Sequence, residues 1–190
     1  FYTRPRELHK GDAEKCYKKW YEIIRETTSV RECKKLKKRV IEDFKKIEID
    51  KNKIVPKVYL LGEFFVLLDP YTNQEIEKTL GDLGLEVQRQ IFFSDWLEHV
   101  LQPSIFYKKE SHRERCVRFA KDYMKRAIGG ECLETVGDTV FAARNGIDGI
   151  VHIMPFSCMP EIVAQNILPK VSKKENIPIL ELVLDEQTGK

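Results

Sequence analysis

Residues 149–161 read Gly-Ile-Val-His-Ile-Met-Pro-Phe-Ser-Cys-Met-Pro-Glu, and the rest of the chain is organised around this stretch. The almost unbroken apolar run at 150–154 is typical of a strand covered on both faces. Pro155 ends the strand because proline has no N–H to donate to a ladder. Pro160 suits a first helical turn, where a missing N–H costs little. The stretch therefore predicts a central strand, a short loop and a helix that opens at Cys158.

At this position Cys158 lies among the backbone N–H groups that a helix start leaves without partners. These groups favour an anion, so we expect them to lower the pKa of the thiol and to hold a thiolate. Such a sulfur can serve as a nucleophile, a redox thiol or a metal ligand. The alternative is a small buried hydrophobic residue, as most free cysteines are. The local sequence leaves both interpretations open.

Strands alternate with helices through most of the chain. The other expected strands are residues 57–65, 85–93 and 178–184, and the expected helices between them are residues 75–84, 94–100, 111–128 and 134–144. Alternation of this kind, with apolar and β-branched strands, is typical of a parallel sheet wrapped by helices. We therefore predict an α/β fold. It comprises a Rossmann-like three-layer lobe at residues 54–190, with a mostly parallel sheet of about four strands, preceded by a helical arm at residues 1–53.

The arm is expected to be helical between about residues 12 and 48, with Asp12 as N-cap. Residues 1–57 carry 18 basic and 10 acidic side chains, whereas the remainder carries 15 and 20. The signs alternate along the arm as on a solvated helix face, and no aromatic residues are interleaved in a basic patch. We therefore expect no nucleic-acid partner.

The composition, 42% hydrophobic and 33% charged over 190 residues, indicates a globular protein. The longest apolar run, residues 58–68, is interrupted by Gly62 and Glu63 and is too short for a bilayer, so no membrane association is expected. The five cysteines contain no CxxC clip, and the N-terminus has no secretion signal, which favours the cytoplasm. Since the chain lacks an initiator methionine and stops abruptly at Lys190, we expect a piece of a longer polypeptide.

Ligands of parallel sheets collect beyond the carboxyl ends of the strands. Three loops should gather there, at residues 63–73, 155–161 and 185–189. The candidate substrate or cleft residues in these loops are Glu63, Asp69, Asn73, Glu161, Asp185 and Glu186.

Several of these residues also have a purely structural interpretation. Asp69 equally suits an ordinary turn and Asn73 an N-cap, and Glu63 suits the exposed end of a strand. His152 is interpreted as a core or interface histidine rather than a catalytic partner of Cys158. The other histidines show no metal-ligand spacing, and the helical cysteines, Cys116 among them, are interpreted as packing residues.

A set of short motifs then resembles a known family. In order, they are Gly62-Glu63, Leu68-Asp69-Pro70 through Asn73, Gly137, Asp148-Gly149, Pro155-Phe156-Ser157-Cys158-Met159-Pro160-Glu161 and Leu184-Asp185-Glu186-Gln187-Thr188-Gly189. This pattern resembles the acyl-CoA dehydratase activase-related proteins, which are relatives of the 2-hydroxyacyl-CoA dehydratases (2-hydroxyglutaryl-CoA dehydratase type). The resemblance covers about residues 55–190 and is most specific at residues 155–161.

The resemblance implies a two-lobed iron–sulfur protein of anaerobic metabolism, with a [4Fe-4S] cluster held by cysteines from both lobes. An activator ATPase would supply an electron, which the cluster passes to an acyl-CoA thioester before water is eliminated. Cys158 matches a cluster ligand. The run 129–132, Gly-Gly-Glu-Cys, departs from the expected Gly-Gly-His-Gly, so a second ligand at Cys132 stays open.

The remaining ligands are expected from a missing N-terminal lobe or a partner subunit, which leaves the isolated piece cluster-free and inactive. A second interpretation is a non-catalytic interaction or regulatory lobe, with no cluster, that is associated with an activator ATPase. A third is a flavodoxin-like binder of a small molecule or nucleotide. The absence of a Gly-x-Gly-x-x-Gly or Gly-Lys-Ser/Thr loop disfavours it.

Overall fold

The computed structural model describes residues 1–93 and 110–185. The chain divides into two compact units. The first contains residues 1–55 together with 79–86, and the second contains residues 56–78 and 87–190. Within the described residues, no helix combines the length and the apolar content that crossing a membrane requires.

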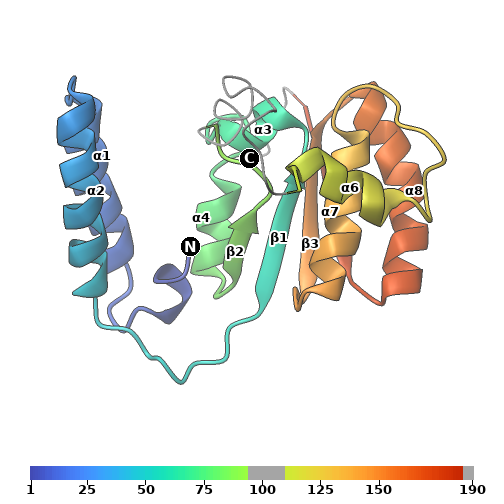
Figure 1. Ribbon diagram of the computed structural model, residues 1–190. Helices are drawn as coiled ribbons and strands as arrows, with labels where there is room; N and C mark the ends of the chain where they lie inside the picture. The colour runs from blue at the N-terminus through green and yellow to red at the C-terminus, as the bar shows by residue number, and fades with distance from the viewer. Residues whose placement is uncertain (94–109, 186–190) are drawn as a thin grey trace. The chain divides into compact units, whose positions relative to one another are not determined.

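The first unit is built from a short 3-10 helix, η1 (Arg4–Arg6), and two amphipathic helices, α1 (Asp12–Arg25) and α2 (Val30–Lys45) (Figure 1). Trp20 on α1 and Leu36 on α2 are buried, while most other positions of the two helices are exposed. The indole N–H of Trp20 donates to Asp43 at 3.2 Å, which ties α1 to the end of α2. The apolar periodicity of the arm is compatible with two helices or with one bent helix, and the structure has two.

The start of α1 differs from the prediction. Its N-cap is Gly11, in the left-handed region at φ 99°, and Asp12 is the first helical residue. The carboxylate of Glu7 accepts the backbone N–H groups of Gly11 and Ala13, each at 2.7 Å. A side chain from outside the helix thus satisfies N–H groups at the start of α1, and Asp12 is not its cap.

The second unit contains a four-stranded parallel sheet in the order β2-β1-β3-β4. Its elements in chain order are β1 (Lys57–Gly62), α3 (Phe64–Leu68), α4 (Ile76–Asp82), β2 (Glu86–Arg89), α6 (His112–Ala120), α7 (Cys132–Arg144), β3 (Gly149–Pro155), α8 (Met159–Glu175) and β4 (Ile179–Leu184). The division into units falls within α4 and within β2, so each of these two elements has residues in both units. The architecture is the predicted Rossmann-like α/β lobe, with the apolar stretch 149–155 as a central strand.

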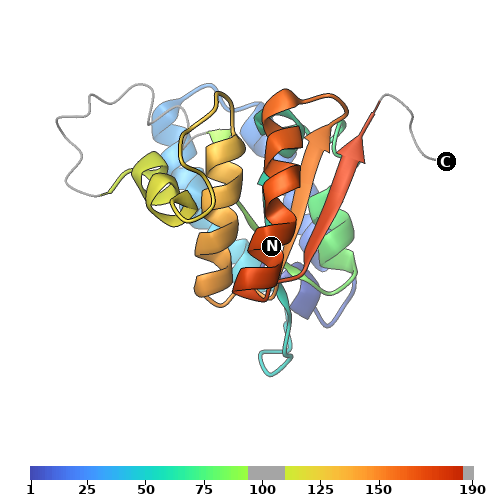
Figure 2. The same cartoon turned by 90° about the vertical axis from the view of Figure 1, so that its right-hand side faces the viewer.

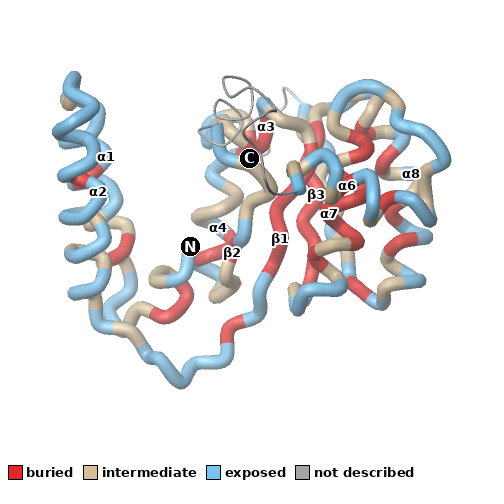
Figure 3. Tube along the Cα trace, in the orientation of Figure 1, coloured by how far each residue is buried: buried red, intermediate tan, exposed pale blue. Residues whose placement is uncertain are grey.

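Helices α7 and α8 cover one face of the sheet, and α6 packs against α7 (Figure 2). The buried positions concentrate in β1, β3 and the inner sides of these helices (Figure 3). β3 is buried along residues 149–154, which explains why its sequence is nearly continuous in apolar residues. The core therefore fixes β3, the strand that leads into the loop before Cys158.

Two boundaries differ from the predictions. The first strand was expected to reach Phe65, but it ends at Gly62, and residues 64–68 are helical. Gly62 has φ 138°, and a Cβ there would lie 1.8 Å from the carbonyl oxygen of Ile153, so only glycine fits this exit. The helix expected at 111–128 ends at Ala120, whose carbonyl accepts the N–H groups of both Tyr123 and Met124 in a turn.

Two smaller differences remain. The helix expected from Glu134 begins two residues earlier, at Cys132. The strand expected at 85–93 is shorter, since β2 covers Glu86–Arg89. The short helix expected at 94–100 lies outside the described residues.

Candidate functional site

The carboxyl ends of three neighbouring strands meet at one edge of the sheet. In the register of the ladder Gly62 lies opposite Ile153, and Pro155 lies opposite Leu184. Two backbone bonds continue the contact into the loops: the N–H of Glu63 donates to Ile153 at 3.1 Å, and the N–H of Phe156 donates to Leu184 at 2.6 Å. The loops after β1, β3 and β4 therefore begin side by side.

Cys158 occupies the N-cap position of α8, directly beyond this edge. Its carbonyl accepts the N–H of Ile162 at 2.9 Å, and its own N–H donates to Pro155 at 3.2 Å. The preceding Ser157 has φ 74°, which turns the chain sharply between strand and helix. The thiol is half-buried, so it is neither a core residue nor fully open to solvent.

The electrostatic surroundings of Cys158 overturn the expected thiolate. Burial raises the pKa of the thiol, and the negative charges of Glu161, Glu63 and Glu131 raise it further. The backbone N–H of Glu161 donates to the sulfur and lowers the pKa, but the other causes outweigh it. The prediction of a lowered pKa was wrong because it counted the helix N–H groups and missed carboxylates brought in by other elements.

Glu161 lies inside the core rather than on the wall of a cleft. Its side chain is 0% exposed, and its Oε2 lies 2.7 Å from Nε2 of His152, which is itself 1% exposed. The hydroxyl of Thr135 on α7 lies 3.1 Å from both carboxylate oxygens. His152 is buried, as its interpretation as a core histidine requires, and Glu161 is its partner.

Asp69 and Asn73 act in the local structure. Asp69 accepts the backbone N–H of Thr72 at 2.9 Å and also its hydroxyl, and these bonds lower the pKa of the carboxyl. Asn73 is 5% exposed and donates to the carbonyl of Val66 at 2.9 Å, while its own oxygen accepts the N–H of Ile76 at 3.4 Å. These contacts favour the turn and N-cap alternatives for both residues.

The other predicted cleft residues differ in position. Glu63 is the N-cap of α3, where its carboxylate accepts the N–H of Val66 at 2.9 Å. Asp185 follows β4 and is exposed. Glu186 lies outside the described residues. Among the predicted cleft residues that the structure describes, Glu63 and Glu161 are those whose charges act on Cys158. Glu131, which precedes α7, acts on it as well.

Cys132, left open as a second thiol ligand, is the first residue of α7 and is 0% exposed. Burial raises the pKa of its thiol to about 11, and the charges of Glu161 and Glu134 contribute. At neutral pH it is therefore a protonated thiol inside the helix layer.

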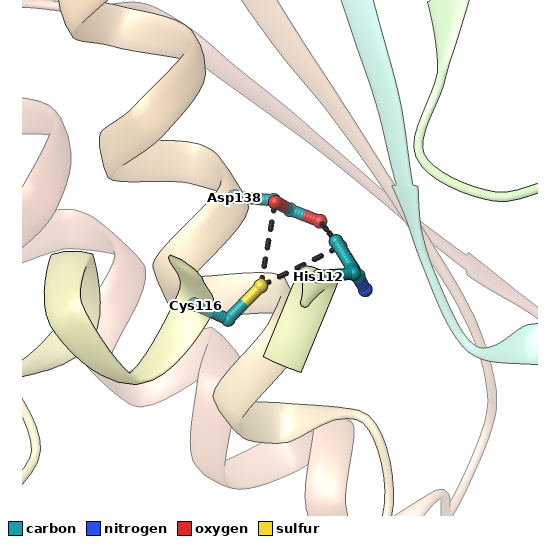
Figure 4. Close-up of side chains that lie close together, drawn as sticks. All are labelled: His112, Cys116 and Asp138. Carbon is teal, nitrogen blue, oxygen red and sulfur yellow. Dashed lines mark hydrogen bonds and ion pairs between the residues drawn. The ribbon is translucent and has the colours of Figure 1, made fainter. Parts of the chain in front are cut away.

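A second constellation lies where α6 meets α7 (Figure 4). Nε2 of His112 is 2.6 Å from Oδ2 of Asp138, and Sγ of Cys116 is 3.4 Å from both that nitrogen and Oδ1 of Asp138. Cys116 and Asp138 are 0% exposed, whereas the His112 side chain is 35% exposed. Burial and the charge of Asp138 raise the pKa of the Cys116 thiol far above its ordinary value. These three residues form a group that could hold a metal ion.

The same contacts exclude a catalytic relay. In a Cys–His–Asp relay the carboxylate holds one ring nitrogen, and the sulfur approaches the other. Here both Cys116 and Asp138 face Nε2 of His112, and the second ring nitrogen points away from them (Figure 4). The arrangement therefore gathers three ligand atoms around one point instead of forming a chain for proton transfer.

This group was not predicted from the sequence. A signal was present in the sequence, because His112 and Cys116 are four residues apart and so share one helix face. The third member, Asp138, comes from another helix, 22 residues beyond Cys116.

Comparisons with protein-family models, with curated proteins and with solved structures find no match for this chain.

Proposed function

We propose that the α/β unit is one lobe of an iron–sulfur protein of the 2-hydroxyacyl-CoA dehydratase kind, in which Cys158 supplies one ligand to a [4Fe-4S] cluster. The motifs of residues 155–161 suggest the family, and the observation that carries the proposal is the position of the thiol. Cys158 is half-buried at the start of α8, beyond the edge where β1, β3 and β4 end. A sulfur in this place is accessible to a group held partly by another lobe.

The charges around Cys158 are negative. Glu63 and Glu131 come from the starts of two other helices, and their negative charges act on the thiol. The charges of Glu63 and Glu161 also raise the pKa of Glu131, after the larger effect of burial. Carboxylates that repel one another raise the local negative charge, and charge beside an iron–sulfur cluster is one of the factors that set its reduction potential.

Within this proposal the residues of the chain have separate roles. The Cys158 sulfur must lose its proton to bind iron, since thiolate is the ligand form. Glu161 does not face the bound group; its bonds to His152 and Thr135 fix the first turn of α8 and so the direction of the thiol. A bound cluster would supply single electrons for transfer to a thioester substrate. This chain offers one accessible thiol at this edge, so other ligands come from another lobe or subunit.

The test uses the chain purified anaerobically together with the polypeptide that carries the other lobe. Iron content and visible absorption are compared between the wild type, Cys158→Ser and Cys33→Ser, with circular dichroism as the check on folding. Cys33 is exposed on α2 and serves as the matched control. We expect Cys158→Ser to lose the iron and the absorption band while Cys33→Ser keeps both. Unchanged iron in a folded Cys158→Ser protein overturns the proposal.

A further inference from the structure

Three side chains from two helices present one ligand atom each around a common point. His112 and Cys116 lie one turn apart on α6, and Asp138 faces them from α7. We propose that Nε2 of His112, Sγ of Cys116 and a carboxylate oxygen of Asp138 bind a divalent transition-metal ion, with Zn²⁺ as the best match. This site is separate from the cluster proposed at Cys158 and does not depend on it.

The distances between the ligand atoms are close to those of a tetrahedral zinc site. With ordinary zinc–ligand bond lengths, a sulfur lies about 3.6 Å from a nitrogen or oxygen ligand, and a nitrogen lies about 3.4 Å from an oxygen. The sulfur of Cys116 already lies 3.4 Å from Nε2 of His112, and the three ligand atoms all lie within 4.8 Å of one another. Only the His112–Asp138 contact, at 2.6 Å, must open to admit the ion.

The donor types select the metal. Thiolate, imidazole and carboxylate together suit Zn²⁺ or its spectroscopic substitute Co²⁺, whereas Mg²⁺ and Ca²⁺ prefer sites made of oxygen alone. Three protein ligands leave a fourth position for water, as in zinc sites that stay open. The partly exposed His112 gives the ion a path from solvent, while Cys116 and Asp138 form the closed side.

The residues around the three ligands support this arrangement. Nη2 of Arg115 lies 3.0 Å from Oδ1 of Asp138, so the arginine holds the carboxylate from behind, as outer partners of metal ligands do. The guanidinium group itself is fixed over the ring of Phe141, 4.3 Å from its centre. The other oxygen of the carboxylate is then free to bind the ion in place of its hydrogen bond to His112.

Hydrogen bonding within the cluster leaves one buried acceptor unsatisfied. Oε2 of Glu134, one turn before Asp138 on α7, is buried and has no hydrogen-bond partner in the described part of the chain. The charge of Glu134 reaches the Cys116 thiol. Nη1 of Arg113 already pairs with Oε1 of Glu134 at 2.8 Å, so Glu134 adds to the negative charge near the site without being a ligand.

Binding requires the loss of one proton if His112 is neutral. The hydrated ion enters, the thiol of Cys116 gives its proton to solvent, and the sulfur forms the metal bond as thiolate. The imidazole binds through Nε2 and carries its proton on Nδ1, which points away from both partners (Figure 4). Asp138 accepts a hydrogen bond from Arg115 through Oδ1 and offers its other oxygen to the ion.

The experiment is a titration of the whole chain with Co²⁺ and then with Zn²⁺ under reducing conditions. Absorption spectroscopy detects the thiolate-to-cobalt charge-transfer band, and isothermal titration calorimetry gives stoichiometry and affinity. The variants are Cys116→Ser and His112→Asn, and the matched controls are Cys33→Ser and His9→Asn. The controls remove the same side-chain types from exposed positions of the first unit. Circular dichroism without metal shows which variants are folded.

We expect one Co²⁺ per chain, with a charge-transfer band that Zn²⁺ removes. Cys116→Ser should abolish the band, His112→Asn should weaken binding by about 100-fold or more, and the controls should change neither. His112 is partly exposed, so its variant should fold even if Cys116→Ser does not. A wild-type chain that binds no metal, or binding unaffected by His112→Asn, overturns the proposal. If the three side chains only join α6 to α7 by hydrogen bonds, the wild-type chain should bind no metal.

Discussion

Nε2 of His152 lies 2.7 Å from Oε2 of Glu161, and neither side chain is accessible to solvent. The pair joins the middle of β3 to the first turn of α8, and Thr135 adds α7 to the same contact. These side-chain contacts hold the first turn of α8, which begins directly after Cys158, against β3 and α7. The second ring nitrogen of His152, Nδ1, is buried without a hydrogen-bond partner among the described residues, and it lies 3.9 Å from Oε1 of Glu181.

Replacement of His152 by leucine should destabilise the fold by about 3 to 5 kcal/mol, because it leaves the buried carboxylate of Glu161 without its partner. The double variant His152→Leu/Glu161→Met should cost much less than the sum of the single changes, since it removes both polar groups together. Urea denaturation of the four proteins gives the coupling free energy directly. Additive costs would show that the two residues contribute independently.

Gly137→Ala should destabilise the α6–α7 contact by about 1 to 3 kcal/mol. A Cβ at this position would lie 2.5 Å from the carbonyl oxygen and 2.6 Å from the Cα of Cys116, which are backbone atoms and cannot rotate away. The matched control is Gly129→Ala, where nothing lies within 4 Å, and it should leave stability unchanged or slightly higher. Thermal unfolding and Co²⁺ binding measured on both variants test the prediction; equal melting temperatures would contradict it.

Glu175→Gln should reduce stability at neutral pH by about 1 to 2 kcal/mol, a value limited by the exposure of the partner Arg144. The bonds from Arg144, at 2.6 and 2.8 Å, and from the hydroxyl of Tyr123 lower the pKa of Glu175 from 4.5 to about 2. Because the folded-state pKa is lowered, this stabilisation is present above about pH 4.5 and is lost as the pH falls toward 2.

The wild type and Glu175→Gln should therefore differ most at pH 7 and differ much less near pH 2. Unfolding free energies in urea at the two pH values provide the comparison. A constant difference across this range would show that the ionised carboxylate is not the source of the effect.

Asn73→Ala should lower the free energy of unfolding by about 2 kcal/mol. The buried side-chain amide of Asn73 donates a hydrogen bond to the carbonyl of Val66 and accepts one from the N–H of Ile76, at the start of α4. Asn145→Ala is the control: its amide makes a similar 2.7 Å bond to Phe141, but at the surface, so the change should cost much less. Denaturant unfolding measures both. Equal costs for the two variants would indicate that burial of Asn73 is not what matters.

Much of the fold follows from local sequence. The apolar stretch 149–154 and Pro155 set the central strand and its end, and the alternation of strands and helices implies parallel neighbours. The boundaries depend on contacts between elements. β1 stops at Gly62 because the backbone of Ile153 passes too close for any side chain, and no property of the first strand alone reveals that approach.

The surroundings of the site were harder to predict. The placement of Cys158 between a strand and a helix is visible in its own sequence, but the carboxylates that raise its pKa arrive from the starts of α3 and α7. His112 and Cys116 are four residues apart, so a helix places both on the same face. They become part of a three-residue ligand set only because Asp138 of α7 lies next to them.

The amino-acid sequence by itself determined the α/β class, the central strand and the position of Cys158 at the start of α8, because periodicity and proline act over a few neighbouring residues. Only the tertiary structure decided that Glu161 is buried against His152, that the Cys158 thiol lies among acids, and that Asp138 completes a group with α6. Burial and charge are set by atoms that are near in space and far apart in the chain, so no local pattern encodes them.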